Sequence, residues 1–321
     1  MLTDILKENK CLKLVCGAGN QNLSEIEKLV ALYSVAGCNF FDLSADINVI
    51  NAAKKGLEYS KITKDRYLCV SVGVKDDIHL MKAEINNCRC KNCGKCAKIC
   101  PQNAIFKVDN LYHINKQNCI GCKKCYSTCS NNAISFQATN SDFKELLPDI
   151  INNGVDCIEF HISAENTEEI FQKWNDLNDL FDGILSICVD RTNFGNKKLI
   201  KILNTLLKDR KPFTTIIQAD GSPMSGGKDD FNSTLQTVAT ADIIDKSEMK
   251  VYTLLSGGTN SKSSELAKLC NIPFNGVSIG SFARKIVKEY IDREDFLQNE
   301  KAFNEALVIA KKLIDDLLNY M

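Results

Sequence analysis

Sixteen cysteines in 321 residues, nine of them within one short window, restrict the possible folds of this chain more than any other feature. Eight of those nine form two runs with the same spacing, C-x2-C-x2-C-x3-C, and the second run begins 29 residues after the first. The runs are Cys90, Cys93, Cys96 and Cys100, followed by Cys119, Cys122, Cys125 and Cys129. The repeat continues past the cysteines, because CPQNAI at 100–105 corresponds to CSNNAI at 129–134. This pattern predicts two similar metal-binding loops within one small unit.

The spacing is typical of bacterial ferredoxins, in which three thiolates of one run bind a [4Fe–4S] cluster and the fourth cysteine binds the neighbouring cluster. We therefore predict one cluster on Cys90, Cys93, Cys96 and Cys129, and a second on Cys119, Cys122, Cys125 and Cys100. Paired zinc ribbons are the alternative, but zinc does not account for two runs of four with the same x3 gap. Cys88 is additional; it could replace Cys90 as a ligand or remain a free thiol, and the spacing favours Cys90.

The cysteine-rich segment is also basic. Residues 86–137 contain eight Lys and Arg against one acid, Asp109. These charges could simply offset the negative charge of the clusters, or they could form a docking face for an acidic electron carrier or an anionic ligand. The whole chain has 40 basic and 40 acidic residues, and this zero net charge argues against general nucleic-acid binding.

The composition is globular, and the sequence shows neither a secretion signal nor a stretch of about 18 apolar residues. We expect a cytoplasmic protein without a membrane segment, in which disulfides are not formed.

Outside the cysteine-rich segment, short β-type runs alternate with amphipathic stretches. Eight strands are predicted at 12–16, 39–44, 67–74, 157–162, 183–189, 213–218, 251–256 and 276–279. Helical patterns include 23–35, 143–152, 197–207, 263–270 and a final helix over about 295–318, with a capping box at Ser24 and Glu27. This alternation predicts an α/β fold, a (β/α)8 TIM-like barrel, with a ferredoxin-like α+β insert after strand 3. The predicted parts are 1–85 for the first part of the barrel, 86–137 for the insert and 138–321 for the remainder.

Polar and glycine residues follow the last three predicted strands, where TIM-barrel enzymes build their sites. Glycine pairs after strands seven and eight would let backbone N–H groups approach a phosphate, and an arginine could add charge. The predicted ligand-binding residues are Asp220, Gly257, Gly258, Gly280, Ser281 and Arg284. Ordinary turn glycines, with the arginine exposed, are the alternative.

Two further groups of polar residues lie on the predicted strands. Alternation places Glu159 and His161 on one face of their strand, inside the barrel or at its mouth, although a histidine there is often a satisfied core residue. Asp190, Arg191 and Asp220 could equally form an ion-pair network at the strand ends.

These blocks together resemble the light-dependent period (LdpA) family of cyanobacterial iron–sulfur proteins. The resemblance rests on LVCGA at 14–18, the double cysteine run, GVDCIEFH at 154–161, QADGSPMSG at 218–226, SGGTN at 256–260 and GVSIGSFAR at 276–284. It implies a redox-active iron–sulfur protein, one that in cyanobacteria passes redox state to the circadian clock by associating with clock components. It implies no particular reaction.

Three functions remain open from the sequence. The first is a redox sensor or electron-transfer protein that works with an electron-carrier or regulatory protein partner. The second is an oxidoreductase in which the clusters feed electrons to a flavin or other phosphate-bearing ligand at the barrel mouth. The third is a purely structural role for the clusters.

Overall fold

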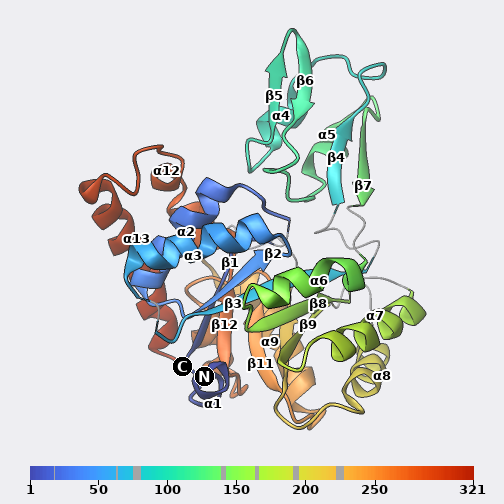
Figure 1. Ribbon diagram of the computed structural model, residues 1–321, viewed down its shortest axis with the longest axis vertical. Helices are drawn as coiled ribbons and strands as arrows, with labels where there is room; N and C mark the ends of the chain where they lie inside the picture. The colour runs from blue at the N-terminus through green and yellow to red at the C-terminus, as the bar shows by residue number, and fades with distance from the viewer. Residues whose placement is uncertain are drawn as a thin grey trace.

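The computed structural model describes residues 1–17, 19–62, 64–74, 81–138, 142–162, 166–190, 195–221 and 228–321. Eight parallel strands close into a barrel in the order β1-β12-β11-β10-β9-β8-β3-β2 (Figure 1). The strands are β1 (Cys11–Val15), β2 (Phe40–Ser44), β3 (Tyr67–Gly73), β8 (Cys157–His161), β9 (Ile184–Asp190), β10 (Thr215–Asp220), β11 (Tyr252–Ser256) and β12 (Gly276–Ile279). All eight predicted strands are present, and the predicted barrel is confirmed.

Helices surround the barrel and bury their apolar faces against it. They are α1 (Leu2–Lys7), α2 (Leu23–Ala36), α3 (Ile47–Ser60), α6 (Phe143–Asn152), α7 (Thr167–Leu180), α8 (Asn196–Leu207), α9 (Phe231–Asp245), α10 (Ser263–Leu269), α11 (Ser281–Ile286), α12 (Lys288–Ile291) and α13 (Glu300–Leu318). The predicted cap of α2 is wrong: Asn22, not Ser24, is the N-cap, and its side-chain oxygen accepts from the Glu25 N–H at 3.2 Å. Asparagine competes well for this position because its short side chain reaches the free N–H groups of the first turn.

The barrel interior is layered. An apolar layer closes the end where the strands begin, and the buried Leu2 and Leu6 of α1 pack against it. Above it the inward side chains are polar and buried, including Lys13, Asp42 and Glu159. TIM barrels are usually filled with branched apolar side chains. A polar layer at this depth therefore points to a function at the open end.

The insert lies in the loop after β3, as predicted. It comprises β4 (Met81–Ile85), α4 (Lys95–Ile99), β5 (Ile105–Val108), β6 (Leu111–Ile114), α5 (Lys124–Thr128) and β7 (Ile134–Ala138). Because β4 pairs antiparallel with β7, the insert's own sheet begins at Met81, ahead of the predicted boundary at residue 86. Its two halves repeat each other with the 29-residue offset of the sequence: Ile85 faces Ile134 in the β4–β7 sheet, and Ile114 faces Ile105 in the β5–β6 hairpin.

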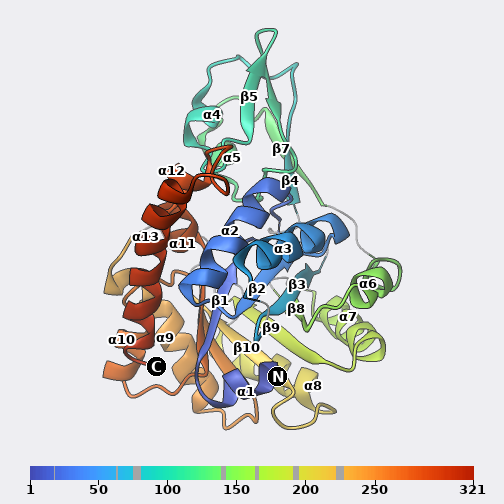
Figure 2. The same cartoon turned by 60° about the vertical axis from the view of Figure 1, so that its left-hand side comes forward.

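The insert projects from the end of the barrel opposite the two chain termini (Figures 1 and 2). Backbone and side-chain contacts join it to the loop after β1. The Gln21 N–H donates to the Gln117 carbonyl at 3.0 Å, and the buried Lys82 ammonium donates to the carbonyls of Gly19 and Cys119. These bonds fix the second cysteine run over the barrel mouth. Among the described residues, no helix is both long enough and apolar enough to span a membrane.

Candidate functional site

The predicted cysteine ligands gather in two groups within the insert. One group surrounds a small cavity next to α4, and it combines three cysteines of the first run with the last cysteine of the second. We call it the distal group: Cys90, Cys93, Cys96 and Cys129. The structure thus places Cys129 with the first run, as the prediction of crossed ligation requires.

The other group lies nearer the barrel, because Cys122 shares a cavity with Arg284, and we call it the proximal group: Cys100, Cys119, Cys122 and Cys125. Burial, together with the neighbouring Cys122, Cys119 and Cys100, raises the pKa of Cys125 to about 12. Burial likewise raises the pKa of Cys122, and Cys100 is the first of the thiols that add to the shift. Thiols that influence one another in this way are close together, and a metal must displace their protons to bind.

Backbone N–H groups point at the cysteine sulfurs of both groups. The Ala104 N–H donates to Cys100 Sγ at 3.3 Å, and its repeat equivalent, the Ala133 N–H, donates to Cys129 Sγ at 3.4 Å. The Ala83 N–H also donates to Cys119 Sγ at 3.4 Å. Hydrogen bonds to the sulfurs tune the potential of an iron–sulfur cluster. The donor set, the crossed arrangement and these N–H groups all fit two [4Fe–4S] clusters.

Cys88 lies outside both groups. It is exposed, and its N–H donates to Asn86 Oδ1 at 3.0 Å. The repeat equivalent of this bond runs from the Gln117 N–H to Asn115 Oδ1 at 2.9 Å. Cys88 therefore corresponds to Gln117, whereas Cys90 corresponds to Cys119, which supports Cys90 as the ligand.

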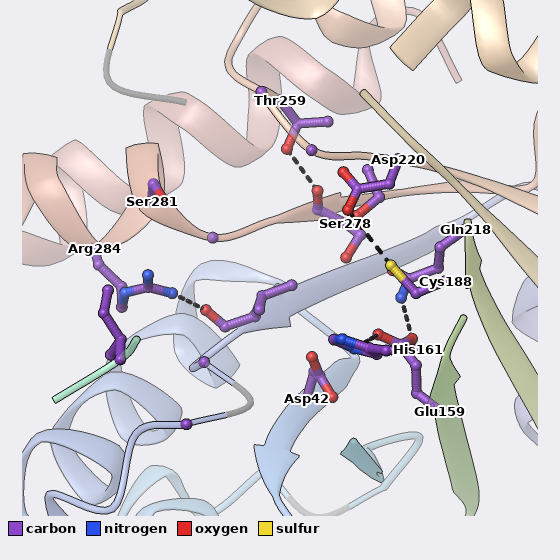
Figure 3. Close-up of a pocket in the computed structure, with 18 residues that line it drawn as sticks. Asp42, Glu159, His161, Cys188, Gln218, Asp220, Thr259, Ser278, Ser281 and Arg284 are labelled. Carbon is purple, nitrogen blue, oxygen red and sulfur yellow. Dashed lines mark hydrogen bonds and ion pairs between the residues drawn. The ribbon is translucent and has the colours of Figure 1, made fainter. Parts of the chain in front are cut away.

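The barrel mouth contains a cavity whose lining comes from β1, β2, β8, β9, β10, β11, β12 and the insert (Figure 3). The insert contributes Ile120, which lies between Cys119 and Cys122 of the proximal group. All six residues predicted to bind a ligand line this cavity: Asp220, Gly257, Gly258, Gly280, Ser281 and Arg284. The structure thus brings these six residues together, and their binding of a ligand stays a prediction.

Two of these residues have structural contacts that differ from the predicted phosphate binding. Gly257 has a φ of +66°, and a Cβ there would overlap the Asp220 carboxylate, so this glycine is required by close packing. The Arg284 guanidinium donates to the Val15 carbonyl at the rim. Three carboxylates, Asp42, Glu159 and Asp220, line the same cavity, and such a lining repels phosphate. The loop at 222–227, which contains part of the QADGSPMSG block, lies outside the described residues.

The polar layer beneath this cavity is centred on Lys13, which the sequence analysis missed. Lys13 is fully buried, and its ammonium contacts Glu159 Oε2 at 2.5 Å and Asp42 Oδ1 at 3.8 Å. The Ser186 hydroxyl donates to Glu159 Oε2 at 3.0 Å, and the Ser71 hydroxyl donates to Asp42 Oδ1 at 2.7 Å. A lysine within the apolar run CLKLV was the available signal, since alternation places Lys13 on the inward face with Cys11 and Val15.

Burial and charge act against each other in this layer. Burial raises the pKa of Asp42 to about 6, although Lys13 lowers it. For Glu159, burial would raise the pKa, but Lys13 and His161 together hold it at about 2. Burial alone would lower the pKa of Lys13, yet Asp42 and Glu159 outweigh it and the pKa is raised. Glu159 and Lys13 therefore form the fixed ion pair of the layer.

Glu159 and His161 share the inward face of β8, as predicted. His161 Nε2 lies 3.2 Å from Glu159 Oε1, so this histidine belongs to the cavity and not to the apolar core. The Cys188 thiol, from the neighbouring strand β9, donates to Asp220 Oδ2 at 3.4 Å. The alternative of an Asp190–Arg191–Asp220 ion-pair network cannot be followed, because Arg191 and the Asp190 side chain lie outside the described residues.

Comparison with known proteins gives two family matches. The model of the light dependent period A C-terminal domain matches residues 149–316, and a 4Fe–4S binding-domain model matches residues 112–135. The "Light dependent period A" protein of Synechococcus elongatus is 29% identical over 290 residues, covering 88% of this chain and 80% of that protein.

Solved structures that align with most of the chain have low sequence identity to it. The YdjI aldolase of Escherichia coli K12 is 7% identical, with coverage of 99% of this chain and 93% of that one and a TM-score of 0.49. Tryptophan synthase of M. tuberculosis is 8% identical, with coverage of 98% and 96% and a TM-score of 0.46.

The 4Fe–4S domain match and the likeness to the Synechococcus protein, together with the cysteine groups, make the chain an iron–sulfur protein. Since the C-terminal-domain model matches just over half of the 321 residues, the chain belongs to the light dependent period A family.

Proposed function

We propose that this protein binds two [4Fe–4S] clusters and acts in electron transfer or redox sensing. The observation that supports this most is that the distal cavity is lined by three cysteines of the first run and one of the second. Two independent four-cysteine sites would each use the four cysteines of one run, whereas two ferredoxin-type clusters exchange the fourth cysteine between the runs. The cytoplasm is the compartment we propose, because free thiols persist there.

The distal and proximal groups would each hold one cluster, which supplies reversible one-electron chemistry. The chain around the two groups differs. Cys93 in the distal group is exposed, whereas Cys119 and Cys125 in the proximal group are buried. The distal site is therefore open to a protein partner, and the proximal site faces the barrel through Ile120.

The surface near the distal group suits an acidic partner. Lys91, Lys95 and Lys98 are exposed there, and the large apolar side chains of Ile99 and Phe106 are each 45% exposed. A basic rim around apolar contacts favours fast, orientated association with an acidic electron carrier or regulatory protein. Replacing Lys95 and Lys98 by Glu should slow electron exchange with such a carrier, most strongly at low ionic strength.

Iron and sulfide analysis of anaerobically purified protein tests the cluster count. We expect about eight irons and eight sulfides per chain, and about four would mean that one group is vacant. A redox titration followed by EPR then tests the function. Clusters that cannot be reduced within the physiological range would leave them a structural role only.

A second candidate is an oxidoreductase that binds an anionic ligand between the insert and the barrel. A second cavity there is lined by Cys122 of the proximal group and by Lys124, Arg284, Lys285 and Lys288. This cavity also contains Glu25 and Asp292, and Lys288 pairs with Asp292 at 2.9 Å, so the excess of positive charge is modest. It nevertheless suits a phosphate better than the carboxylate-lined barrel cavity does.

Thermal shift with FMN and with inorganic phosphate tests this candidate. Stabilisation by FMN that is lost in an Arg284→Gln variant would support a flavin site, and the melting temperature should keep rising with the logarithm of the FMN concentration above its dissociation constant. Stabilisation by neither ligand would reject the candidate while leaving the two-cluster proposal intact.

A further inference from the structure

We infer that Glu159, His161 and Cys188 form a binding site for one zinc-type divalent cation inside the barrel mouth. This site is separate from the two cysteine groups of the insert, and it does not depend on the proposed clusters.

Three different donor types converge at this point from two neighbouring strands. Glu159 Oε1 lies 3.2 Å from His161 Nε2, and with Cys188 Sγ the three donor atoms lie within 4.8 Å of one another. Tetrahedral zinc, with bonds of about 2.0–2.1 Å to nitrogen or oxygen and about 2.3 Å to sulfur, places its donors about 3.3–3.6 Å apart. Glu159 Oε1 and His161 Nε2 are already close to that spacing, and Cys188 Sγ needs to move towards them by at most about 1.3 Å. Carboxylate, imidazole and thiolate together select zinc or a similar borderline metal.

The rest of the layer holds the carboxylate in place for such a role. Glu159 Oε2 accepts from Lys13, Ser186 and Gln218, so the other oxygen, Oε1, is directed towards His161 (Figure 3). Metal-binding carboxylates are normally fixed by hydrogen bonds of this kind to the oxygen that does not bind the metal.

The charges of the described lining also favour a cation. Three carboxylates, Asp42, Glu159 and Asp220, face Lys13 below and Arg284 at the rim, which leaves one net negative charge. Metal binding deprotonates a cysteine ligand, so the Cys188 thiolate would bring this to two. One divalent ion neutralises that charge.

Two buried polar atoms next to the site indicate room for a further ligand. Gln218 Oε1 and Ser278 Oγ line the cavity, and neither has a hydrogen-bond partner among the described residues. Both residues are only 1% exposed. Buried polar atoms are seldom left unpaired. Three protein ligands with a fourth position open to a cavity is the pattern of reactive zinc sites, where water or substrate completes the coordination.

The test uses the anaerobic protein with its iron content intact. The protein is incubated with one equivalent of zinc, desalted, and analysed for zinc and iron, and its zinc environment is measured by X-ray absorption at the zinc edge. We expect about one zinc per chain, unchanged iron, and one sulfur with two or more nitrogen or oxygen neighbours. This spectrum requires no variant, so the test does not depend on how any variant folds.

Variants then assign the ligands. Cys188→Ser should remove the sulfur neighbour, and His161→Ala should weaken zinc binding by more than the roughly 10–100-fold that loss of an outer partner costs. Cys270→Ser, at an exposed thiol outside the barrel, is the matched control and should bind zinc normally. Zinc surrounded by four sulfurs would instead place it in the cysteine groups of the insert. That result would overturn the inference. So would the absence of retained zinc, or zinc binding by His161→Ala that equals the binding by the unmodified protein.

Discussion

The insert and the barrel are built on different sources of stability. The insert has an apolar core of only six buried residues, Ala83, Ala104, Ile105, Cys119, Cys125 and Ile134, and two of these are proposed cluster ligands. The barrel has a continuous apolar core between its strands and helices, and it can therefore contain a polar layer inside. Small units with so limited a core commonly depend on a structural metal or on disulfides for their stability. Cluster binding should consequently decide whether the insert folds, while the barrel folds without it.

Removing the iron provides the largest test of this difference. Chelation under anaerobic conditions should abolish amide hydrogen-exchange protection in residues 81–138, because metal binding supplies the folding free energy of such units. The barrel strands should keep their protection, as measured by exchange and mass spectrometry on the same sample. If β4 to β7 stayed protected after complete iron loss, the insert would be stable on its own core.

The second test separates the two halves of the insert. Cys129→Ser should lose about half of the iron, since one of two clusters is removed. Because Cys129 belongs to the distal group, the thiols released for alkylation should be Cys90, Cys93 and Cys96. The matched variant, Cys100→Ser, should release Cys119, Cys122 and Cys125. Labelling of the opposite set in each variant would show that every run holds its own cluster.

A third test concerns the barrel interior. Lys13→Met should lower the free energy of unfolding by about 3–5 kcal/mol, because it leaves Glu159 and Asp42 buried without their counter-charge. Adding Glu159→Gln to Lys13→Met should recover part of this loss. Lys246→Met, which removes an exposed pair with Asp242, should cost less than about 1 kcal/mol. Denaturant unfolding measures all three, and a similar cost for the two lysines would contradict the buried ion pair.

The smallest expected effect is at the strand end above that layer. Gly257→Ala should destabilise by about 2–3 kcal/mol, since it combines a left-handed backbone with overlap of the Asp220 carboxylate. Gly195→Ala is the control: apart from its chain neighbours, no described residue has an atom within 4 Å of the added methyl group, and the φ of Gly195 is −66°. That control should change stability by less than about 1 kcal/mol, the usual effect at a helix N-cap. Equal melting temperatures for the two variants would show that Gly257 is an ordinary turn glycine.

Sequence patterns were sufficient for the architecture. Apolar runs bounded by turn residues predicted all eight barrel strands, and the cysteine spacing placed the insert after β3. Repetition of the cysteine run was also enough to predict the crossed pairing of Cys129, because ferredoxin-type ligation requires it.

Local competition and long-range packing were harder to predict. Asn22 and Ser24 are both good N-cap residues, and the helix begins after Asn22, whose side chain accepts from the Glu25 N–H. Gly257 was predicted to bind a phosphate. Its close contact with Asp220 joins the ends of two different strands, so the sequence pattern did not show it. Lys13 was missed because its partners come from β2 and β8, far along the chain. Such partners become visible only when the barrel closes.

The antiparallel pairing of β4 with β7 also affects how the barrel closes. Leu68 and Asp156, which are hydrogen-bonded at the start of the β3–β8 contact, are 88 residues apart along the chain. Pairing of Met81 with Ala138 bypasses most of that separation and leaves an effective loop of about 30 residues. The entropic cost of closing the loop then falls by about 1 kcal/mol in free energy. Cluster assembly should therefore favour barrel closure simply by shortening the loop that remains to be ordered.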